Sequence, residues 1–167
     1  MLKQSYADLV ESDLEHWGPE VPKWEQFDRD VFEHPGTVGS CVFLSWSGDQ
    51  LVGFGSYDPR QKPECGIVGH NCVLPEFRGK GIGKQQIQEI IQRFRACRIR
   101  KAKVSTNDHP FFKPAQRMYT ACGFLETGRR HWDGDPSQCI IEYEMKLDNH
   151  GVGRWHIVGE RECRLKM

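Results

Sequence analysis

The sequence contains no long apolar run. Its 167 residues are 38% hydrophobic, with a mean hydropathy of -0.63, and its apolar stretches fall far short of the roughly 18 residues that span a bilayer. The opening residues, 1–6, also lack the apolar segment of a secretory signal. The sequence therefore predicts a cytoplasmic protein without a membrane partner, of a size that forms one globular domain.

Paired cysteines and clustered histidines are also missing. The seven cysteines are scattered singly, with no Cys-x-x-Cys pair, so neither a disulfide framework nor a zinc site is indicated. The seven histidines are dispersed, with no His-x-x-x-His spacing. We therefore expect reduced cysteines and no metal cofactor.

Net charge is absent as well, because 23 basic and 23 acidic side chains balance. This balance argues against nucleic acid as a partner. The charges are nonetheless unevenly placed, since residues 1–35 carry three basic and nine acidic side chains, a net charge of about -6. Residues 93–103 carry six basic side chains and no acid. Solvated faces are the simplest explanation of both segments.

Hydrophobic periodicity predicts alternating helices and strands. Two acidic helices are expected within residues 1–38, at 4–16 and 24–32. A third helix carries a stripe of apolar residues at helical spacing, and a fourth, at 115–121, is ended by Gly123. The stripe consists of Ile87, Ile90, Ile91 and Phe94. Strands are expected at 41–46, 51–57, 67–74, 102–106, 124–130 and 140–147. This pattern indicates an α/β or α+β domain.

The most informative segment lies between the third predicted strand and the helix that follows it. Gly79, Gly81 and Gly83 stand at every second position, so they leave backbone N–H groups uncovered by side chains. The N-terminus of the helix adds the positive end of its dipole, and such a turn binds anions. Cationic side chains surround the glycines at Arg78, Lys80 and Lys84. We therefore expect a phosphate-bearing ligand here.

Two common phosphate motifs do not fit this turn. Lys84 is followed by Gln85 rather than by Ser or Thr, and the glycine spacing differs from the dinucleotide fingerprint. Residues 73–83, Val-Leu-Pro-Glu-Phe-Arg-Gly-Lys-Gly-Ile-Gly, instead resemble the acetyl-CoA pyrophosphate motif of the GNAT superfamily of N-acetyltransferases. Residues 115–124, Ala-Gln-Arg-Met-Tyr-Thr-Ala-Cys-Gly-Phe, are similar to the second motif of that family. The resemblance covers residues 40–147.

The resemblance implies a mixed, mostly antiparallel sheet that is splayed open at the strand before the glycine turn. It also implies acetyl-CoA as the acetyl donor. Backbone groups of Cys72 and Val73 would hold the pantetheine and the thioester carbonyl. Asn107 would reach the pantetheine arm, unless its side chain caps its own loop. The residues that would bind the pyrophosphate are Arg78, Gly79, Lys80, Gly81, Ile82, Gly83 and Lys84.

The resemblance also suggests catalytic residues. Tyr119 matches the family's tyrosine, whose hydroxyl is the usual general acid for the leaving thiolate. The family's usual glutamate base would fall near Ile67, which cannot accept a proton. The remaining candidates for the base are His70, within the same strand, and Glu64, just before it. Imidazole titrates in the useful pH range, although a lone strand histidine is more often structural.

We therefore predict an N-acetyltransferase domain at 1–149, followed by a C-terminal extension at 150–167 that forms either an extra strand or a tail. In the family, the N-terminal helices wall the acceptor groove, and here their acidic charge would attract a cationic amine, either a small molecule or a peptide. The alternative is a domain that binds acetyl-CoA or CoA as a signal and transfers nothing. The family's opening strand is not readable in the sequence. Residues 154–157 are expected to replace it, within the chain or swapped into a homodimer.

Overall fold

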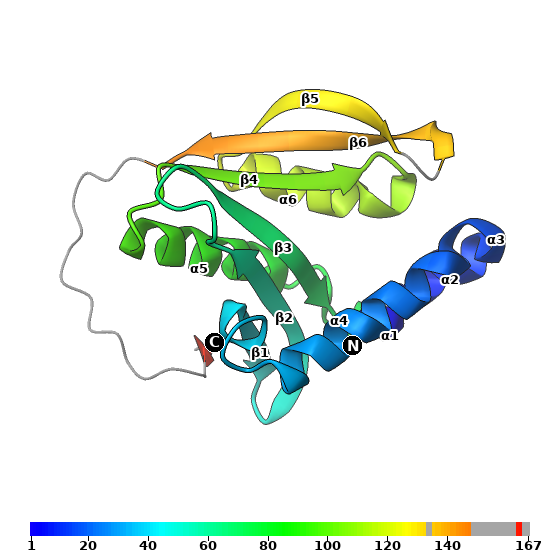
Figure 1. Ribbon diagram of the computed structural model, residues 1–167. Coiled ribbons are helices and arrows are strands. Elements are labelled where there is room, and N and C mark those ends of the chain that lie inside the picture. Colours follow the sequence, from blue (N-terminus) through cyan, green and yellow to red (C-terminus); the bar gives the residue numbers. More distant parts are fainter. Residues whose placement is uncertain (133–134, 148–162, 165–167) are drawn as a thin grey trace. The chain divides into compact units, whose positions relative to one another are not determined.

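The computed structural model describes residues 1–132, 135–147 and 163–164, which belong to two compact units (Figure 1). The first unit contains residues 1–56, 70–83 and 163–164. The second contains residues 57–69, 84–132 and 135–147. Across these described residues, the helices are too short or too polar to cross a membrane.

The first unit begins with short helices. The predicted helix at 4–16 is broken into α1 (Leu2–Ser5), α2 (Ala7–Ser12) and α3 (Leu14–Trp17). The second break falls at Asp13, whose backbone has φ -158° and ψ 84°, and whose carboxylate accepts a hydrogen bond from the N–H of His16. That bond is the one an N-cap makes, so Asp13 starts a new helix. The second predicted helix is confirmed as α4 (Val21–Glu33).

The strands of the first unit pack against α1 and α4. β1 (Val42–Ser47) and β2 (Gln50–Asp58) pair antiparallel. β3 (Gly66–Val73) lies next to β2, and the N–H of Leu74, just after β3, donates to the Val52 carbonyl at 2.9 Å. The core of this unit is a buried cluster of Leu2, Trp24, Phe54 and Cys72. These residues come from α1, α4, β2 and β3 respectively, so the core joins the helices to the strands.

The C-terminal extension contributes one described element. β7 (Cys163–Arg164) pairs in parallel with β1 at Ser45 and Trp46, which gives the first unit the strand order β3-β2-β1-β7. The replacement strand predicted at 154–157 lies outside the described residues. As the sequence suggested, the described chain opens with a helix, α1, and not with a strand.

The second unit contains the first residues of β3, 66–69, and three further strands. β4 (Lys101–Asn107) pairs antiparallel with β6 (Asp135–Lys146), which pairs antiparallel with β5 (Leu125–Trp132). The strand order is β5-β6-β4-β3. β3 and β4 pair in parallel at Gly66–Ala102 and Ile67–Lys103, which lie at the start of both strands. The predicted mixed, mostly antiparallel sheet is therefore confirmed. The ladder that joins β4 to β3, the strand before the glycine turn, is short.

Two helices follow these strands. α5 (Ile82–Ala96) buries all four residues of its predicted apolar stripe: Ile87, Ile90, Ile91 and Phe94. α6 (Lys113–Ala121) lies beside β6 (Figure 1), where Tyr119 and Tyr143 have their ring centroids 5.9 Å apart. Gly123 has φ +96°, and the N–H of Phe124 donates to the Tyr119 carbonyl at 3.1 Å. The predicted C-terminal cap of α6 is thus confirmed. Short 3-10 helices occur at Gly18–Glu20, Gly39–Cys41, Pro75–Phe77 and Pro110–Phe112.

Candidate anion and catalytic site

The glycine turn has the backbone conformation that its sequence predicts. Gly79 and Gly81 have φ of +76° and +82°, a region that other residues rarely adopt. No atom lies within 4 Å of the place where a Cβ would stand at either glycine, so open space adjoins the turn. α5 begins at Ile82, directly after it. The first N–H groups of a helix have no acceptor within the helix, so this turn presents several donors to an anion.

The basic side chains around the turn make contacts of their own. The guanidinium of Arg78 donates from Nε to the Val73 carbonyl at 3.2 Å and from Nη2 to the Ser5 carbonyl. Lys80 Nζ lies 4.7 Å from the centroid of the Phe77 ring. Arg78 therefore ties α1 to the end of β3. The backbone N–H of Arg78 donates to the Pro75 carbonyl at 3.1 Å, so both the side chain and the N–H of this residue have partners within the protein.

The C-terminal end of β3 contacts α1. The Cys72 Sγ and Ser5 Oγ atoms are 2.6 Å apart, and both residues are 2% exposed. Burial raises the pKa of the Cys72 thiol, opposed in part by the hydrogen bond with Ser5. Because only a thiolate is a good nucleophile, this cysteine is poorly suited to covalent catalysis.

His70 lies two residues earlier in the same strand. Its imidazole packs edge-on against Phe27 of α4, with ring centroids 4.8 Å apart. Its backbone carbonyl accepts a hydrogen bond from the Ser56 hydroxyl at 3.1 Å. Burial lowers the pKa of His70, and the negative charge of Asp28 partly opposes that effect. The imidazole is therefore neutral at neutral pH and able to accept a proton.

Glu64 is placed differently. It precedes β3, and its carboxylate accepts hydrogen bonds from Arg100 Nη1 at 2.9 and 3.2 Å. The Glu64 side chain is 69% exposed. The Glu64 carboxylate is thus held at the protein surface by the Arg100 guanidinium.

Asn107 ends β4 and holds the loop that leads to α6. Its Oδ1 accepts a hydrogen bond from the His109 N–H at 2.7 Å, and its backbone carbonyl accepts one from Gln116 Nε2 at 3.0 Å. Asn107 and Gln116 are both buried. The loop-capping role considered from the sequence is therefore present. It also fixes the orientation of the amide, whose NH2 group is the donor that a pantetheine arm would need.

Tyr119 lies on α6 in the second unit. Its ring packs against Phe124, at a centroid distance of 6.1 Å, as well as against Tyr143, and the residue is 6% exposed. The side chain is thus held firmly by aromatic neighbours. A tyrosine in such surroundings has a well-defined position for its hydroxyl group.

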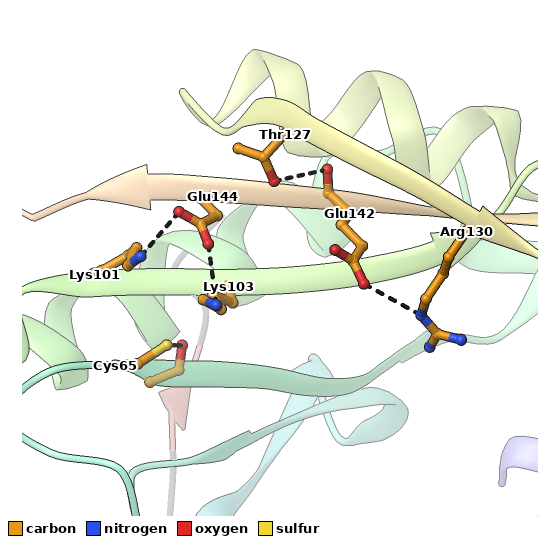
Figure 2. A network of polar contacts seen from close by, with 8 residues as sticks. Cys65, Lys101, Lys103, Thr127, Arg130, Glu142 and Glu144 are labelled. Atoms are coloured by element: carbon orange, nitrogen blue, oxygen red, sulfur yellow. Dashed lines mark hydrogen bonds and ion pairs between the residues drawn. The ribbon is translucent and has the colours of Figure 1, made fainter.

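Four of the six basic side chains at 93–103 pair with carboxylates, and Figure 2 shows two of them, Lys101 and Lys103. Glu144 on β6 accepts from Lys101 Nζ at 3.0 Å and pairs with Lys103 Nζ at 3.1 Å. These two lysines lower the pKa of Glu144. Two further pairs of this segment join Arg93 to Glu89 and Arg100 to Glu64. Outside the segment, Arg130 pairs with Glu142. A solvated face, as considered from the sequence, accounts for this segment.

The acidic segment contains one carboxylate in an unusual place. Asp28 Oδ2 lies 2.8 Å from the α-ammonium group of Met1. Asp28 did not stand out in the sequence, because this contact joins residues 27 positions apart in the chain. At the exposed end of α4, the ligand atoms of Asp30, Glu33 and His34 lie within 4.8 Å of one another. Exposed acidic groups of this kind are common without an ion, and we assign them no role.

The mixed sheet with the glycine turn at the N-terminus of α5 defines an α/β domain, and a turn of this kind suits an anion. The family model described as the Acetyltransferase (GNAT) family matches residues 4–124. This match covers more than half of the chain, and the chain belongs to that family.

Solved structures agree on the fold. A GNAT-family protein from Desulfovibrio desulfuricans is 19% identical over 62% of this chain and 66% of its own, just under two thirds, with a TM-score of 0.56. A GNAT-family acetyltransferase from Elizabethkingia anophelis with acetyl-CoA bound is 19% identical over 64% of this chain and 75% of its own, with a TM-score of 0.55. The ribosomal-protein-S18-alanine N-acetyltransferase from Escherichia coli is 14% identical over 66% of this chain and 70% of its own, with a TM-score of 0.53. No curated protein matches the chain.

Proposed function

We propose that this chain is an N-acetyltransferase that moves an acetyl group from acetyl-CoA directly to a cationic primary amine. The observation that carries the proposal is the turn of Gly79 and Gly81 at the start of α5, whose φ values and open surroundings suit a pyrophosphate. Family membership supports the same donor. Of the relatives, the Elizabethkingia anophelis structure has acetyl-CoA bound.

Residues of the first unit and of α5 would hold the donor. The N–H groups from Gly79 to Lys84 are proposed to bind the pyrophosphate, and backbone groups of Cys72 and Val73 the pantetheine. The N–H of Arg78, which the sequence placed in the same set, donates to the Pro75 carbonyl at 3.1 Å instead. The Asn107 amide is proposed as a further donor to that arm. The buried, neutral thiol of Cys72 favours direct transfer over an acetyl-cysteine step.

The chemistry needs one proton acceptor and one proton donor. The amine nitrogen attacks the thioester carbonyl carbon, so that a C–N bond forms while the C–S bond breaks. We assign His70 to accept the proton that the amine loses and Tyr119 to donate a proton to the leaving sulfur. A positioned acid or base typically contributes about 10²–10⁴-fold to the rate.

His70 is preferred to Glu64 as the base on physical grounds. A base must be deprotonated near neutral pH, and its accepting atom must not already be held by another group. His70 meets this condition because burial lowers its pKa, whereas Glu64 is exposed and paired with Arg100.

The acceptor is proposed to be cationic because the N-terminal segment is strongly acidic. The net charge of residues 1–35 is about -6, and a field of this sign raises the local concentration of cations. Salt weakens such attraction, since the Debye length falls from about 10 Å at 0.1 M to about 3 Å at 1 M.

Release of free CoA thiol, measured with a panel of amines at low and high salt, tests the proposal. We expect turnover with cationic primary amines, with a KM that rises with salt. Turnover confined to neutral or anionic amines would contradict the acceptor class. Tight binding of acetyl-CoA with no release of CoA thiol in the presence of any amine would contradict the enzyme and support the alternative, a domain that binds CoA as a signal.

A further inference from the structure

The carboxylates of the acidic segment differ in their partners. Three of them are held by side chains of the same segment: Glu20 by Lys23, Glu25 by Lys3 and Asp30 by Gln26. Asp28 instead holds the α-ammonium group of the backbone at Met1, at 2.8 Å. Its side chain is 30% exposed, so it is partly buried and still within reach of a ligand from solvent.

The residue next to Asp28 contacts the strand that leads to the glycine turn. This residue, Phe27, packs edge-on against His70 and stacks on Phe54 at 5.9 Å. Met1 neighbours the Asp28 carboxylate in space, and Phe27 precedes Asp28 in the sequence. Both residues pack against the buried cluster that contains Cys72. The negative charge of Asp28 acts on His70 and on Cys72. A cation bound at Asp28 is thus held one residue along α4 from the side chain that packs against the proposed base.

An ammonium bound to a carboxylate keeps its proton. The opposite charge raises the pKa of the amine, and a protonated nitrogen has no lone pair with which to attack a carbonyl. A group held by Asp28 is therefore a poor nucleophile. An acceptor that uses this carboxylate needs a second amine, which loses its proton and reacts.

We propose that Asp28 anchors one ammonium group of a diamine or polyamine acceptor while another amine of the same molecule is acetylated. This inference rests on the proposed function and names the residue that sets its substrate class. The acceptor's ammonium takes the place of the Met1 ammonium on Oδ2. One ammonium replaces another, so the hydrogen-bonding needs of the carboxylate are met in both states.

Matched amines test the anchor. Putrescine and butylamine, or cadaverine and pentylamine, have the same carbon chain and differ by one cationic group. We expect the intact protein to give the diamine a kcat/KM about tenfold or more above that of the monoamine. Asp28→Asn is expected to remove most of this preference by raising the KM for the diamine, with a much smaller change for the monoamine and for acetyl-CoA.

Two variants serve as controls. Asp30→Asn removes a carboxylate two residues further along α4, one that accepts a hydrogen bond from Gln26, and should keep the diamine preference. Asp28→Glu keeps the charge and should restore part of the preference lost in Asp28→Asn. If Asp28→Asn slows both amines equally while lowering the melting temperature, the carboxylate is only a structural partner of Met1, and the proposal is overturned.

Failure of the anchor is distinct from failure of the proposed function. If the intact protein acetylates diamines and monoamines equally well, the function stands and the anchor falls. If it acetylates no amine, the function falls, and calorimetric binding of cadaverine decides on the anchor. Weaker binding to Asp28→Asn than to the intact protein and to Asp30→Asn supports the anchor in that case, and equal binding overturns it.

Discussion

Replacing Arg78 by Gln separates two roles of this residue. The arginine could act through its cationic side chain on a phosphate, or it could hold α1 against the end of β3. The structure favours the second role, because the guanidinium donates to the Val73 carbonyl at 3.2 Å and to the Ser5 carbonyl. The backbone N–H of residue 78, which donates to the Pro75 carbonyl at 3.1 Å, is kept in the variant.

The magnitude follows from these two hydrogen bonds. A hydrogen bond to a charged group contributes about 1.5–3 kcal/mol, and an exposed one contributes less. The bond to Ser5 is partly buried and the bond to Val73 is exposed. We therefore expect Arg78→Gln to lower the free energy of unfolding by about 2 kcal/mol. For a chain of this size, that loss corresponds to a fall in melting temperature of about 4–8 °C.

Thermal unfolding and equilibrium binding of acetyl-CoA together test this reasoning. Arg60→Gln is the matched control, because Arg60 is 87% exposed and pairs with Asp58 at the surface. We expect the control to melt within about 2 °C of the natural sequence. A stable Arg78→Gln variant that binds acetyl-CoA about tenfold more weakly, with a reduced salt dependence, would refute the docking role and assign the side chain to a phosphate.

Three further predictions concern the proposed chemistry and the core. Tyr119→Phe should lower kcat by about 10²-fold or more with little change in acetyl-CoA affinity, and an unchanged kcat would remove Tyr119 from the role of acid. Because burial lowers the pKa of His70, kcat/KM should fall only as the pH drops below about 6.5, where His70 becomes protonated. An acidic limb that persists in His70→Gln would exclude the histidine as the base. Gly66→Ala would place a Cβ 2.6–2.8 Å from ring atoms of Phe94, which is fully buried. Overpacking of this kind costs about 1–3 kcal/mol, so denaturant unfolding should show a loss of that size, and Gly36→Ala, with no atom within 4 Å, should not.

The sequence predicted well those features that depend on neighbouring residues. The glycine turn, the start of α5 after it and the apolar stripe of α5 follow from backbone preferences and helical spacing within a few residues of chain. The cap of α6 at Gly123 is of the same kind. The helix expected at 4–16 was wrong in its continuity, because Asp13 forms a local hydrogen bond to the N–H of His16 that starts a new helix.

The functional assignments that needed contacts at long range could not be read from the sequence. Arg78 stands in a motif for a pyrophosphate, yet its side chain binds the carbonyl of Ser5, 73 positions earlier. Asp28 is one of nine acids in its segment, and only the folded chain brings it to the Met1 ammonium and Phe27 to His70. Local patterning determined the phosphate-binding turn and its helix, because such structure follows from neighbouring residues. Tertiary packing decided which side chains adjoin the strand before that turn, because side chains meet there only after distant segments pack together.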